Sequence, residues 1–352
     1  MTTVNRKVNL DLLRIIACVF VIGIHFLNGL KAADSNQFIV IIIESIVSIG
    51  LPIFFILTSV GLVSKEEYVN NLAHFYINKL IDIFFPFLIF SIFYYFVTYG
   101  FGLSISSIVD GIKCALISMT QKQQYYHLWY IYTLMGLYLF LPYLKVLLNS
   151  LDAKRILILI IVSLLVRAMR NYNLFIIGEY GVTGWMIYYV LGYYCLKYID
   201  CKRKAICMYV LGILSFVLIL FLSQPFINER FNYQLYSVSV PMYFVTAAVF
   251  LFFLRLNDLS WPELIKKIVQ YVGSHTYIIY LIHPFVKNNI EKMNWVEMIN
   301  NCYLKYILLV LIVFCVSLIF SITLNQILLR PLCKYIKFII RKLELIIATA
   351  LA

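Results

Sequence analysis

The stretch NLDLLRIIACVFVIGIHF, residues 9–26, decides the architecture of this chain. It is an apolar run long enough to cross the roughly 30 Å hydrocarbon core of a bilayer as a helix. Arg14 and His25 interrupt it, eleven residues apart. Eleven residues make about three helical turns, so both side chains project from nearly the same face, roughly 16 Å apart along the axis. The segment predicts a membrane-spanning helix with two ionisable groups on one face.

The rest of the chain repeats this pattern of long apolar runs between short polar gaps. The 352 residues are 63% hydrophobic and 13% charged, whereas soluble domains have about 45–50% apolar and about 25% charged residues. We therefore predict an all-α, polytopic membrane helical bundle of about ten transmembrane helices. The predicted spans are 8–29, 37–63, 80–100, 125–147, 155–171, 183–200, 205–223, 237–256, 268–286 and 303–329.

The distribution of Lys and Arg predicts the orientation. With a cytoplasmic N-terminus, most of the 29 Lys and Arg residues fall in the inner gaps, as the positive-inside rule requires. Both termini are then cytoplasmic and the helix count is even. Amphipathic helices are expected within 101–124 and over 330–352, the second as a basic cytoplasmic tail. No gap is long enough for a soluble domain, so residues 1–352 are expected to form one membrane-embedded domain.

Two other classes of protein are excluded by the placement of charge and cysteine. The net charge of +13 lies in short gaps between apolar runs rather than on one face of a soluble module, which argues against a nucleic-acid partner. The cations face lipid head groups instead. The eight cysteines form no C-x-x-C pair and have no metal-ligand spacing, so no metal site is predicted.

Ionisable groups at membrane depth are costly, and each is a functional hypothesis. Arg14, near the inner face, suits the phosphates of a phosphorylated donor. His25, deeper in the membrane, suits a base for a hydroxyl group. The alternatives are structural. Arg14 would extend to the lipid phosphates, paired with Asp11 one turn earlier, and His25 would be a hydrogen-bonded packing residue.

Two further segments add polar groups at opposite sides of the membrane. Lys79 and Asp82 lie one turn apart at the inner face, where they either pair with each other or help Arg14 to hold a donor. At the outer end of the span 125–147, Tyr126 and Trp129 are typical of an interfacial aromatic belt. His127 between them is less expected in such a belt.

A carboxylate and a second histidine also fall within predicted spans. Glu44 lies in the outer half of the span 37–63 and needs a partner, for which His25, Arg167 and Arg170 are the candidates. His283 lies near the outer end of the span 268–286.

Five stretches of the chain, in order, resemble the acyltransferase type 3 family, the integral membrane O-acetyltransferases of bacterial surface polysaccharides. They are DLLRIIACVFVIGIH, LPIFFILTSVGL, HLWYIYTLMGLYLFLPYL, YYVLGYYCLK and SHTYIIYLIHPF. The chain departs from the family pattern twice. Thr58-Ser59 stands where the family has Ser-Gly, and Lys79-x-x-Asp82 stands where it often has Arg-x-x-Arg. The second departure removes position 82 from the cationic set.

The resemblance implies an acyl-CoA donor, usually acetyl-CoA, that enters from the cytoplasm, and a glycan hydroxyl as acceptor. Arg14 and Lys79 would hold the donor, and Arg14 would also polarise the thioester. His25 would be the general base or become transiently acylated. The acceptor would be bound by His127, Trp129, Tyr126, Glu44 and His283. The resemblance implies no tightly bound cofactor, and it places the protein in the bacterial cell membrane as a multi-pass protein.

Three other functions remain compatible with these residues. Intramembrane cations and a polar cavity would equally serve an exporter of glycan intermediates, a role proposed for some members of the same family. A glycan polymerase would need a long outer loop, and none is predicted. A sensor or scaffold that has lost the chemistry is compatible with the Asp82 departure.

Overall fold

The computed structural model describes residues 8–33, 36–100, 104–171, 182–224, 238–256 and 261–351. In these ranges the chain is helical and contains no strand. The elements are α1 (Val8–Ile24), α2 (Leu27–Ala33), α3 (Gln37–Val47), α4 (Gly50–Ser64), α5 (Glu67–Asn70), α6 (Leu72–Lys79), the π-helix η1 (Leu80–Phe84), α7 (Phe85–Tyr99), α8 (Ile105–Gln121), α9 (Trp129–Ser150), α10 (Ala153–Asn171), α11 (Val182–Tyr198), α12 (Lys202–Leu222), α14 (Val240–Arg255), α15 (Glu263–Ile290), the 3₁₀-helix η2 (Asn294–Val296), α16 (Cys302–Leu324), the π-helix η3 (Asn325–Leu329) and α17 (Arg330–Leu351).

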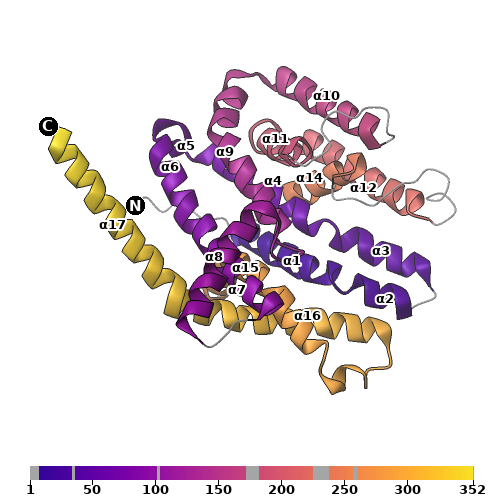
Figure 1. The fold of residues 1–352 in the computed structure, drawn as a ribbon. Coiled ribbons are helices and arrows are strands. Elements are labelled where there is room, and N and C mark those ends of the chain that lie inside the picture. Colours follow the sequence, from indigo (N-terminus) through magenta and orange to yellow (C-terminus); the bar gives the residue numbers. More distant parts are fainter. Residues whose placement is uncertain are drawn as a thin grey trace.

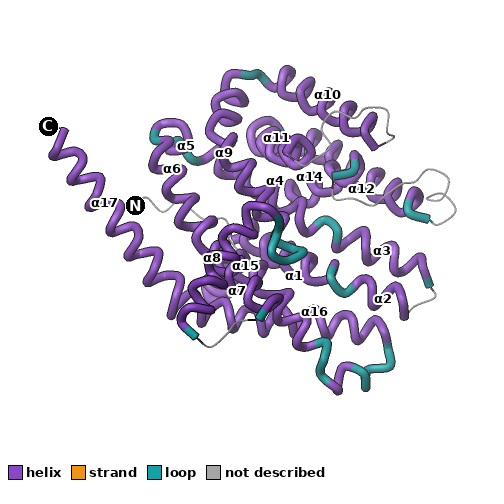
Figure 2. The backbone as a smooth tube through the Cα atoms, in the orientation of Figure 1, coloured by secondary structure: helices purple, strands orange, loops and turns teal. Residues whose placement is uncertain are grey.

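The bundle is organised around α1, which packs against α4 and α15. On either side of these three helices, α11 packs against α4 and α16 packs against α15. Figure 1 shows α17 extending away from the rest of the bundle and α10 at its edge. The helices are joined mostly by short connections, drawn in teal in Figure 2. The bundle therefore places α1, which carries Arg14 and ends just before His25, among helices that come from both halves of the chain.

A helix lies within each of the ten predicted ranges, but the count of ten spans is not confirmed. By length and composition, five helices in the described part of the chain can cross a membrane, or six if the bent pair α1–α2 is one span. The five run over Gln37–Ser64, Leu72–Tyr99, Trp129–Ser150, Lys202–Leu222 and Cys302–Ile340.

The helices that fall short do so for physical reasons. α11 has 17 residues and α14 has 16, which gives lengths of about 24–26 Å at 1.5 Å per residue, less than the roughly 30 Å of apolar core. α15 has 28 residues, but buried His275, Thr276 and His283 lower the hydropathy of its middle.

Hydrogen bonds join helix ends that the charge pattern predicts on one side of the membrane. Asn9 Nδ2, at the start of α1, donates to Leu256 O after α14 at 2.6 Å. Arg255 donates to Ile199 O after α11 at 2.8 Å. These contacts agree with the predicted alternation of helix directions along the chain.

The two π-helices each precede a proline. Pro86 follows η1 and Pro331 follows η3 by two residues. A proline has no N–H to donate, and its ring pushes away the carbonyl four residues earlier, which in both cases belongs to the π-helix. The helix stays continuous by widening locally. Because the helix continues through η1, the span predicted at 80–100 begins earlier, at Leu72. The Asn71 side chain caps this start by accepting a hydrogen bond from His74 N.

Candidate active site

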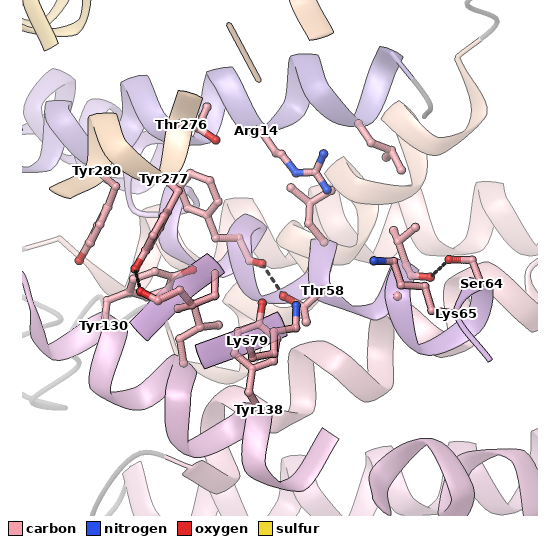
Figure 3. Close-up of a pocket in the computed structure, with 17 residues that line it drawn as sticks. Arg14, Thr58, Ser64, Lys65, Lys79, Tyr130, Tyr138, Thr276, Tyr277 and Tyr280 are labelled. Atoms are coloured by element: carbon pink, nitrogen blue, oxygen red, sulfur yellow. Dashed lines mark hydrogen bonds between the residues drawn. The ribbon is translucent and has the colours of Figure 1, made fainter. Parts of the chain in front are cut away.

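The larger of two central cavities has a volume of about 600 Å³ and is called here the basic cavity. Its lining includes three cations and no carboxylate among the residues that the structure describes. Figure 3 shows Tyr130, Tyr277 and Tyr280 on one side of the view and Lys65 on the other. The lining residues are Leu10, Arg14, Phe54, Leu57, Thr58, Val60, Gly61, Ser64, Lys65, Lys79, Ile83, Tyr130, Leu134, Tyr138, Thr276, Tyr277 and Tyr280.

Arg14 is held in the basic cavity by a buried carboxylate. Its Nη1 lies 2.5 Å from Asp11 Oδ1 one turn earlier on α1. The Asp11 side chain is buried, whereas that of Arg14 is 32% exposed. Gly273 of α15 permits this packing, because a Cβ there would lie 2.9 Å from the Asp11 Cβ. The predicted Asp11–Arg14 pair is therefore present, and it points the guanidinium into the cavity rather than away from it.

Lys79 lines the same cavity at the end of α6, with its Nζ 4.3 Å from the centre of the Tyr138 ring. This distance permits a cation–π interaction. Asp82, which the sequence offered as a partner for Lys79, lies 2.9 Å from Lys337 of α17. The residue that departs from the family pattern thus joins η1 to the C-terminal helix.

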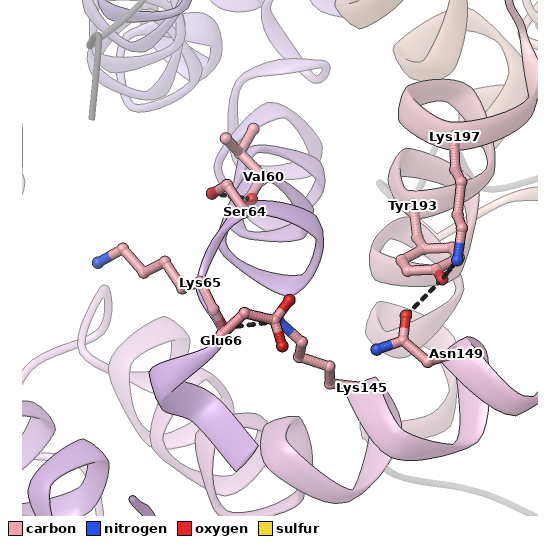
Figure 4. Close-up of polar contacts among 8 residues, drawn as sticks. All are labelled: Val60, Ser64, Lys65, Glu66, Lys145, Asn149, Tyr193 and Lys197. Atoms are coloured by element: carbon pink, nitrogen blue, oxygen red, sulfur yellow. Dashed lines mark hydrogen bonds and ion pairs between the residues drawn. The ribbon is translucent and has the colours of Figure 1, made fainter. Parts of the chain in front are cut away.

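Lys65 is a third cation of the basic cavity, and the sequence analysis gave it no role. It follows the last turn of α4 in an extended conformation, with its N–H donating to Gly61 O. Its carbonyl accepts a 2.6 Å hydrogen bond from Lys145 Nζ of α9, which also lies 3.4 Å from Glu66 Oε1. In Figure 4 the Lys65 side chain points away from Lys145. The Lys145 side chain is only 1% exposed.

The contact between Lys145 and the end of α4 gives a hydrogen-bond donor to a carbonyl that lacks a partner within the helix. The last carbonyls of a helix lack internal partners and carry partial negative charge, so a cation there is favourable. A buried ammonium group in turn needs such acceptors. The sequence does carry a signal of this, since Lys145 stands inside the predicted span 125–147.

The second cavity, called here the histidine cavity, has a volume of about 250 Å³. It adjoins a vestibule of about 450 Å³ that shares His25, Glu44 and Tyr126 with it. The histidine cavity is lined by Val21, Ile24, His25, Leu27, Glu44, Ser48, Leu51, Tyr126, His127, Trp129 and Tyr280. The vestibule adds Asn28, Lys31, Lys287 and Asn288.

Three histidines from distant parts of the chain meet beside this cavity. His25 lies in the break between α1 and α2, whose axes differ by 50°. Its ring is stacked on that of His283 with 5.2 Å between centres. The His127 ring lies 5.5 Å from that of His283. Tyr126 contacts His25 edge-on at 5.1 Å. The structure thus brings together the histidines that the sequence singled out on three separate segments.

Backbone carbonyls fix the tautomers of two of these histidines. His127 Nε2 lies 3.3 Å from Leu281 O, and His283 Nδ1 lies 2.7 Å from Tyr280 O. A carbonyl oxygen only accepts hydrogen bonds, so these nitrogens carry the hydrogens of the neutral rings. His127 Nδ1 and His283 Nε2 are then acceptors, and both are buried without a partner among the described residues. His127 lines the histidine cavity, where its Nδ1 is suited to accept a hydrogen bond from a hydroxyl group, whereas His283 lies behind the lining of both cavities and of the vestibule.

The partner of Glu44 differs from the predicted candidates. Glu44 Oε1 lies 2.8 Å from Lys31 Nζ, on the α2 helix that the sequence had merged with the first span. Arg167 instead donates from Nε to Val238 O at 2.8 Å, and the side chain of Arg170 lies outside the described residues. The bend at His25 separates α2 from α1, and α2 packs beside α3.

Tyr280 of α15 is the residue that the two cavities share. Its hydroxyl donates a short hydrogen bond to the carbonyl of His127. The sequence alone does not single out Tyr280, although it lies three residues before His283 on the same helix face. Tyr280 therefore separates two groups of predicted site residues. The basic cavity on one side holds Arg14 and Lys79, and the histidine cavity on the other holds His25, Glu44, Tyr126, His127 and Trp129.

A family model described as an acyltransferase domain matches residues 7–326. The chain belongs to the acyltransferase 3 family. No curated protein and no solved structure matches it. The matched range contains every residue that lines the two cavities and the vestibule. Family and helices together make this a multi-pass membrane acyltransferase, and within the described ranges no group of three or more His, Cys, Asp or Glu residues could hold a metal ion.

Proposed function

We propose that this acyltransferase moves an acyl group, most simply acetyl, from acyl-CoA in the basic cavity to a hydroxyl group of a cell-surface or lipid-linked glycan in the histidine cavity. The observation that carries the proposal is the meeting of two chemically different cavities at Tyr280. A two-substrate transfer needs a site for each substrate and a point where they meet.

The basic cavity suits the donor because coenzyme A carries several phosphate charges. Arg14, Lys65 and Lys79 line it, and Arg and Lys are the side chains that bind phosphate. The tyrosines on the Tyr280 side of the cavity offer a less charged environment for the pantetheine arm and the thioester. The Lys and Arg distribution predicts that this cavity lies on the cytoplasmic side of the membrane, where acyl-CoA is made.

The histidine cavity suits a hydroxyl acceptor. His127 Nδ1 is a buried acceptor there, and the Tyr126 and Trp129 rings offer faces on which a sugar can stack. In the transfer, the sugar oxygen attacks the thioester carbon, the C–O bond forms and the C–S bond breaks. His25 takes the hydroxyl proton and returns it to the coenzyme A sulfur, as a general base and then a general acid. A route through acylated His25 would give the same products.

The test uses the purified protein in liposomes with acetyl-labelled acetyl-CoA and the surface glycan of the source cell. We expect release of coenzyme A together with label in an alkali-labile ester on the glycan. Movement of the glycan across the bilayer without consumption of acetyl-CoA would reject the proposal in favour of an exporter. Comparing ester-linked acyl groups on the glycan of cells with and without the protein would identify the acceptor.

A further inference from the structure

We infer that Tyr280 determines whether the acyl group goes to a glycan hydroxyl or to water, by separating the thioester from the solvent of the histidine cavity. The inference rests on the proposed function, because it takes the basic cavity as the donor site and the histidine cavity as the acceptor site. It assigns Tyr280 a role in acceptor specificity that is distinct from binding either substrate.

The position of Tyr280 supports this role. Its side chain is 3% exposed and lines both cavities. Its hydroxyl group donates to His127 O, and its ring centre lies 5.0 Å from that of Tyr130 and 5.5 Å from that of His127. The ring is therefore fixed at its tip by the hydrogen bond and along its body by neighbouring rings.

The chemistry requires such a separation. A base that removes a proton from a sugar hydroxyl removes one from water equally well, and His25 lines both the histidine cavity and the vestibule. Attack by water forms the C–O bond of a free carboxylic acid, breaks the same C–S bond and passes the water proton to the coenzyme A sulfur. The donor would then be lost without transfer, a side reaction that water exclusion prevents.

In this arrangement the acyl group of the donor itself opens the path between the two cavities. For transfer, the acyl group must displace the Tyr280 ring from His127 O and occupy the space that the ring leaves. The acyl group itself then fills the opening, so that only the hydroxyl held beside His25 and His127 reaches the thioester carbon. With a smaller side chain at position 280, the opening exceeds the acyl group and water enters beside it.

Tyr277 provides a matched control on the same helix. It lines the basic cavity but not the histidine cavity, and its hydroxyl also donates to a backbone carbonyl, that of Ile83, at 2.7 Å. Tyr277→Ala and Tyr280→Ala therefore remove the same type of side chain one turn apart, from a half-buried and a buried position. Only the second removes a wall between the cavities.

The experiment measures, in liposomes, acetyl-CoA hydrolysed per glycan ester formed. We expect Tyr280→Ala to raise this ratio by about tenfold or more, because a whole side chain is lost rather than one hydrogen bond. Tyr280→Phe keeps the ring and loses only the bond to His127 O, so we expect a rise of about two- to tenfold. Tyr277→Ala should weaken the use of acetyl-CoA without raising the ratio.

An unchanged ratio in either Tyr280 variant that folds would overturn the inference, and Tyr280→Phe decides alone if Tyr280→Ala does not fold. An equal rise in Tyr277→Ala would also overturn it, because the effect would then come from a loosened α15. Failure of the proposed function looks different, since the unmodified protein would then consume no acetyl-CoA with the glycan present.

Discussion

The basic cavity and the vestibule next to the histidine cavity differ in the charges of the residues that line them. In the vestibule each lysine has a carboxylate, with Lys31 2.8 Å from Glu44 and Lys287 2.7 Å from Glu291. The basic cavity is lined by Arg14, Lys65 and Lys79 and, in the described part of the chain, by no carboxylate. The lining of the basic cavity therefore carries an excess of cations, which favours phosphates, although Asp11 behind the lining pairs with Arg14. The lining of the vestibule includes the Glu44 carboxylate beside its cations.

The two sites also differ in how the backbone builds them. The cations of the basic cavity stand on α1 and at the ends of α4 and α6. The histidines stand at irregular points: His25 in the break after α1, His127 just before α9 and His283 beside Pro284 inside α15. Broken helices leave backbone groups and side chains available to a cavity, and in membranes such breaks are tolerated where they line one.

The largest effect is expected from His25→Ala, which removes the proposed base from the histidine cavity. Glycan acylation should fall by about 10²–10⁴-fold, the usual worth of general base catalysis, while the KM for acetyl-CoA changes little. His74→Ala is the matched control, because His74 is exposed and lines neither cavity. Normal acylation by His25→Ala in well-inserted protein would remove His25 from the chemistry.

How well the sequence predicts these sites depends on how far apart in the chain the contacting residues are. Arg14 and His25 were found because they fall in one predicted helix, where a fixed rise and rotation relate them, although the structure places His25 in the break after α1. His127 and His283 were flagged only as polar groups at membrane depth. Their approach to His25 depends on packing between α1, the start of α9 and α15, which no local pattern encodes. Tyr280 was missed for the same reason, since an intramembrane tyrosine is unremarkable until it is seen between two cavities.

The number of membrane spans is also predicted only in part from the sequence. Hydropathy located a helix in each predicted range, but the bend at His25 interrupts the first span and the polar middle of α15 lowers the hydropathy of that helix. These irregular points also carry site residues, since His25 lies at the bend and His283 lies in α15. The features that make the bundle harder to predict from hydropathy are thus those that bring its functional groups together.

The next largest effect is expected from Arg14→Ala on the basic side. Hydrogen bonds to charged groups are worth about 1.5–3 kcal/mol, so the KM for acetyl-CoA should rise by about 10–100-fold. The KM for the glycan should not change, because Arg14 does not line the histidine cavity. Arg14→Lys should recover part of the loss by keeping the charge. An unchanged dependence on acetyl-CoA concentration would assign Arg14 to lipid contact.

A smaller effect is expected from Lys145→Met, which tests positioning rather than binding. Lys145 contacts the backbone of Lys65 but lines neither cavity. Its loss leaves the Lys65 carbonyl without this donor, at a cost of about 1–3 kcal/mol in stability, and frees the turn that aims Lys65. The KM for acetyl-CoA should rise several-fold, with little change in kcat.

A double-mutant cycle separates this role from general destabilisation. If Lys145 acts through Lys65, then Lys145→Met adds little to the KM effect of Lys65→Ala. Lys197→Met is the control, because Lys197 binds Tyr193 at 2.7 Å in the neighbouring network of Figure 4 and does not contact Lys65. Fully additive effects of Lys145→Met and Lys65→Ala would contradict the positioning role.

The smallest effect is expected from Glu44→Gln in the histidine cavity. The side chains of Glu44 and Lys31 are 25% and 44% exposed, and ion pairs with this exposure are worth about 0–1 kcal/mol. The KM for the glycan should therefore change by less than about fivefold, with the KM for acetyl-CoA unchanged. A change of tenfold or more would mean that the carboxylate binds the glycan directly. Lys31→Met distinguishes a carboxylate that binds the glycan from one that only neutralises Lys31. If Glu44 binds the glycan, removal of Lys31 frees the carboxylate and lowers the KM for the glycan. If Glu44 only neutralises Lys31, Lys31→Met and Glu44→Gln give the same KM for the glycan.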